Sequence, residues 1–200
     1  MKYIKFLLAI TTLFFIEGCS FKVVKKPIVK YAIVNNTDIK RSDFSINKIL
    51  KVDHFKSLKT LQSNQIWYQK PAYKTNSYVY SCWSSDFNLL IEKNISDALF
   101  KSHIFKSVFK GYSKIKADLL LEGDILKAIQ SINDKGKVIF EIRLYLIDKR
   151  SGKLIGTKEF DYKKRCKSLN AKGAVNAYNQ VVQNLDKDVV LWIKKLMKKN

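Results

Sequence analysis

The stretch ADLLLEGDILKAIQSI, residues 117–132, decides the fold. It predicts a long β-strand, in which Gly123 is a candidate for a bulge. A hairpin turn, NDKG, follows at residues 133–136, and an alternating run at residues 138–146 predicts a second strand. After another turn, residues 153–162 predict a third. The three strands are expected to form an antiparallel meander.

The segment that follows the meander predicts a long amphipathic helix. Ser168 or Asn170 can cap its first turn, and apolar residues then recur at spacings of three and four over residues 171–196. An apolar stripe of this length has to be buried against another surface. The sheet is the partner that we expect, and a partner helix or a membrane surface are the alternatives.

The sequence before the meander predicts a second helix and several shorter strands. The helix is expected over residues 87–101, after the capping group SSD. Residues 54–63 are expected to form a loop. The expected strands are residues 30–34, 44–52, 65–68, 77–83 and 104–109. The order of elements predicts an α+β fold, a single antiparallel sheet with two long helices packed on one face.

The first residues resemble a bacterial lipoprotein signal peptide. Lys2 and Lys5 precede an uncharged, mostly apolar run over residues 6–16, which is shorter than the roughly 20 residues of a membrane-spanning helix. An aliphatic residue three positions before Cys19, and a glycine directly before it, resemble a lipobox, although Glu17 departs from that pattern. The alternative is an ordinary apolar segment with a chance cysteine.

The lipobox resemblance implies three segments. Residues 1–18 are the signal peptide, residues 19–29 are a lipidated tether, and residues 30–200 are the domain. Cys19 is expected to carry a covalent diacylglycerol and an acyl chain such as palmitate, which together anchor a protein stably. Ser20, in place of the aspartate that retains lipoproteins in the inner membrane of enteric bacteria, implies the periplasmic leaflet of the outer membrane; the inner membrane is the alternative. Lysines of the tether would lie near anionic headgroups.

Two cysteines remain in the expected domain, Cys82 and Cys166. In an oxidising periplasm they can pair, and each precedes a predicted helix, so that proximity is compatible with the predicted order of elements. The alternatives are a disulfide between them or two free, partly buried thiols.

The composition argues against several classes of function. The chain has 200 residues with 38 Lys plus Arg against 17 Asp plus Glu, a formal net charge of +21, which favours contact with anionic surfaces. His54 and His103 lack metal-binding spacing, so we expect no metal site and no catalysis. Asp118, Glu122 and Asp124 share one strand parity and indicate an exposed strand face rather than a catalytic pair. Nucleic acid is not an expected partner of a secreted, anchored protein.

The order of motifs resembles the ABC-type transport auxiliary lipoprotein family. A lipobox is followed by an aromatic strand ending in Trp83, a helix ending in ALF at residues 98–100, the motif ADLLLEG at residues 117–123, and a terminal helix reaching VLWI at residues 190–193. The resemblance covers nearly the whole expected domain. It implies a non-enzymatic lipoprotein without cofactors, which accompanies MCE-domain phospholipid transporters of the Mla and Pqi kind and docks their MCE protein.

The family resemblance supplies no ligand site at the level of residues. Tyrosine and tryptophan are favoured in interface cores, so the aromatic segment before the first helix supplies candidates for partner contact, namely Tyr73, Tyr78, Tyr80 and Trp83. The alternative is that these residues pack against the last helix. A different function is also open: an envelope scaffold lipoprotein that activates a peptidoglycan synthase, or that joins an outer-membrane assembly or secretion complex.

Overall fold

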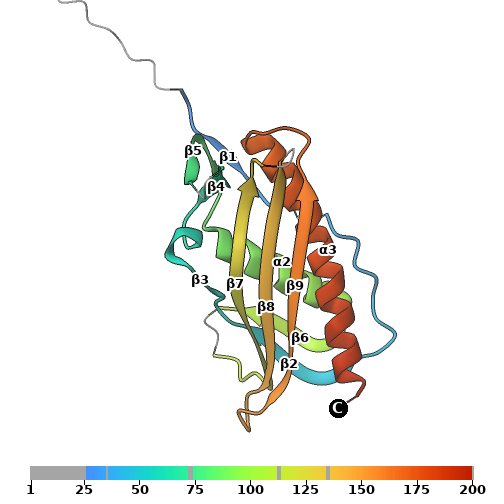
Figure 1. Ribbon diagram of the computed structural model, residues 1–200. Coiled ribbons are helices and arrows are strands. Elements are labelled where there is room, and N and C mark those ends of the chain that lie inside the picture. The colour runs from blue at the N-terminus through green and yellow to red at the C-terminus, as the bar shows by residue number, and fades with distance from the viewer. Residues whose placement is uncertain (1–25, 35, 72–73, 112–113, 134–135, 200) are drawn as a thin grey trace, which may run out of the picture.

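The computed structural model describes residues 26–34, 36–71, 74–111, 114–133 and 136–199, and these residues form an α+β domain (Figure 1). In this part of the chain, two helices lie against a curled sheet of nine strands. The elements in chain order are β1 (Val29–Tyr31), β2 (Ile46–Val52), β3 (Lys56–Ser57), the 3-10 helix η1 (Lys59–Leu61), β4 (Gln65–Gln69), β5 (Thr75–Trp83), α2 (Phe87–Ser102), β6 (Phe105–Lys110), β7 (Leu119–Ser131), β8 (Lys137–Asp148), β9 (Leu154–Arg165) and α3 (Ala171–Met197).

The predicted antiparallel meander is confirmed as β7, β8 and β9. The β7–β8 register runs from Leu119 opposite Asp148 to Ser131 opposite Lys137. The bulge lies between Ile125 and Lys127, so its expected position at Gly123 was wrong. Gly123 serves close packing instead: a Cβ there would lie 2.8 Å from Cδ2 of Leu144 and 2.9 Å from Cδ1 of Phe55.

The prediction of a single antiparallel sheet was wrong, because the sheet is mixed. β1 pairs parallel with β5, and β2 pairs parallel with β6. The edge of β7 that faces away from β8 pairs parallel with three successive segments, β2, β3 and β4. Alternation of side chains tells which face of a strand is buried but not in which direction its neighbour runs, so the sequence pattern could not reveal these pairings.

Both helices pack on the same face of the sheet, as expected. Phe140 of β8 is fully buried, and its ring centroid lies 6.0 Å from that of Phe87 on α2. Phe87 in turn lies 5.3 Å from Tyr178 of α3, so one aromatic cluster joins both helices to the meander. Asn170 is the cap of α3, where its Oδ1 accepts a hydrogen bond of 2.9 Å from the backbone N–H of Gly173.

A buried carboxylate on α3 holds the irregular segment between β1 and β2. Oδ2 of Asp186 accepts a 2.8 Å hydrogen bond from the hydroxyl of Thr37, and both residues are buried. Among the residues that the structure describes, Oδ1 of Asp186 has no hydrogen-bond partner. Burial, the largest effect, raises the pKa of Asp186 to about 7 despite the hydrogen bond from Thr37. None of the helices in the described part of the chain is long and apolar enough to cross a membrane.

Candidate functional site

A groove runs beside β7 on the sheet surface that faces away from the helices. Its first hollow has a volume of about 450 Å³ and its last about 440 Å³, and a smaller hollow joins them. Lys56 and Asp124 line both the first and the joining hollow, and Leu58 and Leu126 line both the joining and the last. We call this continuous feature the β7 groove.

The first end of the β7 groove carries charged groups of both signs, beside the apolar side chains of Ile147 and Leu154. Its lining includes Asp53, His54, Lys56, Glu122 and Asp124. The hydroxyl of Tyr145 on β8 donates a 2.9 Å hydrogen bond to Oδ2 of Asp124 and so fixes that carboxylate. The end therefore presents basic groups from the 54–56 segment opposite acidic groups from β7.

Asp53 is held in its ionised form at this end. Burial opposes the charge, but the backbone N–H of His54 and the ammonium of Lys51 outweigh it and lower the pKa of Asp53 below its ordinary value. The Lys51 Nζ lies 3.2 Å from Oδ1 of Asp53. Asp53 is thus already balanced by a lysine.

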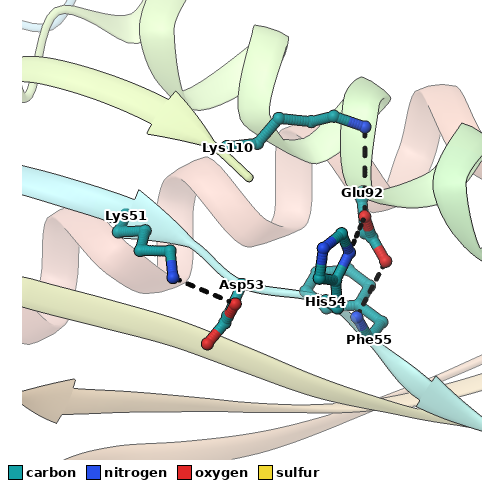
Figure 2. Close-up of polar contacts among 6 residues, drawn as sticks. All are labelled: Lys51, Asp53, His54, Phe55, Glu92 and Lys110. Atoms are coloured by element: carbon teal, nitrogen blue, oxygen red, sulfur yellow. Dashed lines mark hydrogen bonds and ion pairs between the residues drawn. The ribbon is translucent and has the colours of Figure 1, made fainter. Parts of the chain in front are cut away.

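The buried side chain of Glu92 holds the segment of the chain that forms one wall of the charged end. Glu92 is 1% exposed and reaches from α2 to the turn after β2, where Oε1 accepts a 2.8 Å hydrogen bond from the backbone N–H of Phe55 (Figure 2). Oε2 lies 3.3 Å from Nδ1 of His54 and 3.9 Å from Nζ of Lys110 on β6. A buried N–H without an acceptor costs about 1–3 kcal/mol, so Glu92 fixes the turn that carries His54 and Lys56.

Analysis of the sequence missed Glu92 as a functional residue. The available signal was its spacing: it precedes Ile95 by three residues, which places it on the apolar side of the predicted helix. An acidic residue on such a face needs a buried partner. That partner is the backbone N–H of Phe55, in a segment expected to be loop. A pattern of side chains cannot predict a hydrogen bond to a backbone N–H.

The other end of the β7 groove is mainly apolar, although Lys127 and three uncharged polar residues also line it. Leu58 is 69% exposed there, and Leu61, Trp67, Leu126 and Ile129 also line it. The indole N–H of Trp67 donates a 3.0 Å hydrogen bond to the carbonyl of Thr60, which holds the ring against η1.

This apolar end exists because the sheet is locally open. β3 pairs with β7 at Asp124 and Ile125, and β4 pairs with it only from Gln130 onward. In the described part of the chain, no strand pairs with residues 126–129 on this edge. The η1 turn leaves the sheet over this interval, and the hollow lies between η1, Trp67 and β7.

The β7 groove offers binding chemistry: charged groups of both signs at one end and an apolar hollow at the other. Among the residues that the structure describes, no group of three or more His, Cys, Asp or Glu is arranged to hold a metal ion.

The aromatic candidates from the sequence have different surroundings. Tyr73 and Cys19 lie outside the described residues. Trp83 is 2% exposed and packs 5.5 Å from Tyr178 of α3, so for this residue packing against the last helix replaces the suggested partner contact. Tyr78 is half-buried; its hydroxyl donates a 2.6 Å hydrogen bond to Oε1 of Gln130, and burial raises its pKa to about 12.

Of the three aromatic candidates that the structure describes, Tyr80 is the one that is exposed. It is 52% exposed, and the preceding Val79 is 76% exposed. Neighbouring residues of a strand point to opposite faces, so β5 is uncovered on both faces at this point. The Nζ of Lys26 lies 5.9 Å from the Tyr80 ring centroid, which places the start of the described chain beside it. We call Val79, Tyr80 and the exposed Ile28 and Val29 the β1–β5 tip.

Cys82 and Cys166 are free cysteines in the structure, so the disulfide considered from the sequence is not formed there. Cys82 is half-buried and Cys166 is buried. Burial raises the pKa of the Cys166 thiol, which keeps it protonated and unreactive at neutral pH.

The family model of the ABC-type transport auxiliary lipoprotein component matches residues 33–190, which include β2 to β9 and most of α3. The chain belongs to this family. Membership makes it an auxiliary component of ABC-type transport and indicates a lipoprotein held at a membrane of the cell envelope. The family description names no enzymatic activity.

Solved structures share the fold of this auxiliary lipoprotein component. A DUF330-family protein from Xanthomonas campestris is 13% identical with a TM-score of 0.75, and the match covers 86% of this chain and 98% of that one. An uncharacterised protein matches with a TM-score of 0.66 at 12% identity, over 84% of this chain and 99% of that one. A hypothetical protein from Chlamydia trachomatis matches with a TM-score of 0.54 at 10% identity, over 78% and 100%. No curated protein matches the chain.

Proposed function

We propose that the chain is a non-enzymatic, lipid-anchored periplasmic accessory component of an ABC/MCE-type phospholipid transport system, and that it docks the MCE subunit at the outer membrane. The observation that carries the proposal is the family match, which extends over nearly the whole folded body. That family provides the association with an ABC-type transporter. The MCE partner is the further step of the proposal.

The anchor in this proposal is Cys19 with its diacylglycerol and acyl chain. Lys26, where the described chain begins beside Tyr80, is seven positions after Cys19. An extended chain of that length spans at most about 25 Å. The β1–β5 tip would therefore stay near the membrane surface, with the tether lysines close to anionic headgroups.

The β1–β5 tip is the surface that we propose for MCE contact. It combines exposed aliphatic side chains with an exposed tyrosine, and tyrosine is among the residues that most often dominate the binding energy of protein interfaces. Its place at the anchored end suits a component that receives a partner at the outer membrane.

Co-purification from detergent-solubilised membranes of the native host tests the docking. The wild-type chain should recover an MCE-domain protein, and Tyr80→Asp should reduce the recovery about tenfold, because a charge at an interface core is costly. Leu191→Asp is the matched control, since Leu191 is 62% exposed on α3. Recovery of a peptidoglycan synthase instead would favour the envelope-scaffold function and contradict the proposal.

The anchor has a test of its own. Cys19→Ala should leave the precursor unprocessed and free of fatty-acid label after metabolic labelling, because the thioether needs the thiol. Equal label in wild type and variant would overturn the anchor while leaving the family assignment intact.

A further inference from the structure

The outer surface of β7 changes its chemistry at the bulge. Before it, Glu122 and Asp124 carry charge; Leu126 in the bulge and Ile129 after it present apolar side chains to the groove, with Lys127 between them. The 54–61 segment on the opposite wall changes in the same order. It begins with His54 and Lys56 and continues to Leu58 and Leu61. Along both walls of the β7 groove, charged residues therefore come first and mainly apolar residues follow.

The length of the β7 groove matches one extended lipid. Glu122 and Ile129 are seven residues apart on one strand, which corresponds to about 23 Å. One leaflet of a bilayer, headgroup included, is about 20–22 Å thick. A molecule with a charged head and a long apolar tail would meet the polar and apolar ends of the groove together.

We propose that the β7 groove binds one zwitterionic phospholipid with an ammonium headgroup, such as phosphatidylethanolamine. The phosphate lies at Lys56 and His54, the ammonium lies at Glu122 and Asp124, and an acyl chain enters the hollow beside Trp67. This inference rests on the proposed function, in which the transport system carries phospholipid. It adds that this subunit binds the phospholipid itself.

The mixed charge of the polar end favours a zwitterion over an anion. Asp53 is already balanced by Lys51, but Glu122 and Asp124 remain close to the site where a headgroup would lie. A lipid with only a phosphate would bring its negative charge to Lys56 and His54 but would offer no cation to Glu122 and Asp124. Like charges at short range are unfavourable, so phosphatidylglycerol should bind about fivefold more weakly.

Fluorescence of the purified full chain tests the proposal. The chain has three tryptophans, Trp67, Trp83 and Trp192, and only Trp67 lines the groove. Phosphatidylethanolamine with brominated acyl chains, supplied as monomers from cyclodextrin, should quench the fluorescence saturably at one lipid per chain, because bromine quenches an indole that it contacts. Trp67→Phe should remove the quenched component.

Two substitutions at exposed positions check the location. Leu126→Asp and Leu58→Asp each place a charge in the apolar end and should weaken binding about tenfold. Lys56→Glu should weaken it about fivefold through the phosphate. Leu191→Asp, outside the groove, should bind as the wild type does. Circular dichroism of each variant confirms that it is folded, and having two apolar-end variants keeps the test decisive if one of them does not fold.

Several results would overturn the proposal. Absence of quenching at saturating lipid, quenching that persists in Trp67→Phe, or unchanged affinity in both apolar-end variants would show that lipid does not occupy the groove. If an extended apolar peptide from the MCE partner, carrying a brominated side chain, quenches Trp67 and the brominated lipid does not, the groove is a protein-docking site. Phosphatidylglycerol binding as tightly as phosphatidylethanolamine would refute the headgroup assignment.

The lipid test and the docking test fail separately. Quenching is measured on the purified chain without a partner, whereas docking is measured by recovery of the MCE protein with changes at Tyr80. A chain that binds lipid but recovers no MCE protein refutes the proposed function only, and the opposite result refutes the groove only.

Discussion

The two edges of β7 are built in different ways. One edge pairs with β8 from Leu119 to Ser131, interrupted only by the bulge between Ile125 and Lys127. The other is divided among the short parallel strands β2, β3 and β4, and over residues 126–129 no strand of the described chain pairs with it. The continuous edge belongs to the core, and the divided edge borders the groove.

The difference shows how one strand can serve stability and binding together. On the β8 side, consecutive backbone hydrogen bonds and buried residues such as Leu144 reinforce one another. On the other side, a single buried carboxylate, Glu92, replaces ladder bonds by holding Phe55. Substitutions on the two sides should therefore differ strongly in their effect on stability.

The largest effect is expected in the meander core. Phe140→Ala removes a fully buried ring that contacts Phe87 of α2, and it should lower the free energy of unfolding by about 3–5 kcal/mol. Urea denaturation measures this. A loss below about 1 kcal/mol would show that the meander is not the main source of stability.

The next effect tests the carboxylate on the divided side. Glu92→Ala should cost about 2–4 kcal/mol, because it leaves the buried N–H of Phe55 without its acceptor and removes the partner of His54 and Lys110. Glu92→Gln keeps an acceptor and should cost less than half as much. Hydrogen exchange at the Phe55 amide should accelerate in the alanine variant; unchanged protection there would refute the positioning role.

Asp186 on α3 holds Thr37 much as Glu92 on α2 holds Phe55, but one of its carboxylate oxygens has no hydrogen-bond partner among the described residues. Removal of the buried negative charge of Asp186 should therefore stabilise the fold. Its folded-state pKa is raised from 3.8 to about 7, so stability is greatest below the unfolded pKa and falls as pH rises through the folded pKa. Asp186→Asn keeps an acceptor for Thr37 and should raise the free energy of unfolding by about 1–3 kcal/mol at pH 8. Denaturation from pH 4 to 8 should show the decline in wild type only; parallel profiles would contradict this.

Gly123 links the two sides of the comparison, since its missing side chain leaves room for Leu144 from the meander and Phe55 from the divided side. Gly123→Ala should cost about 1–3 kcal/mol through overpacking. Thermal denaturation measures it, and a stabilised variant would mean that the two side chains move apart easily.

The smallest effect is expected at the rim of the groove. Leu58→Ala changes a mostly exposed side chain and should alter the free energy of unfolding by no more than about 0.5 kcal/mol. A loss comparable to that of Phe140→Ala would show that Leu58 belongs to the core rather than to a binding surface.

The contrast between the two edges also explains what the sequence could reveal. β7, β8 and β9 were predictable because long alternating runs and turn residues mark each strand. Asn170 as a helix cap and the stripe on α3 were predictable for similar local reasons. The parallel pairings were not, because they join segments far apart in the chain.

The groove depends on non-local contacts and was therefore missed. Glu122 and Asp124 were noted as an exposed strand face, but the facing wall comes from the segment expected to be loop. For Trp83 the sequence left two alternatives, partner contact or packing against the last helix, because a tryptophan in a strand suits an interface as well as a core. The contact with Tyr178 of α3 decides for packing.

The central claim is that an anchored auxiliary lipoprotein receives an MCE protein at its β1–β5 tip. Site-specific photo-cross-linking in living cells, with a photoreactive residue in place of Tyr80, tests it most directly. The account predicts a cross-link to an MCE-domain protein from position 80 and none from position 191, which lies on α3 and is more exposed than Tyr80. A peptidoglycan synthase captured from position 80, or the same MCE protein captured equally from both positions, would contradict it.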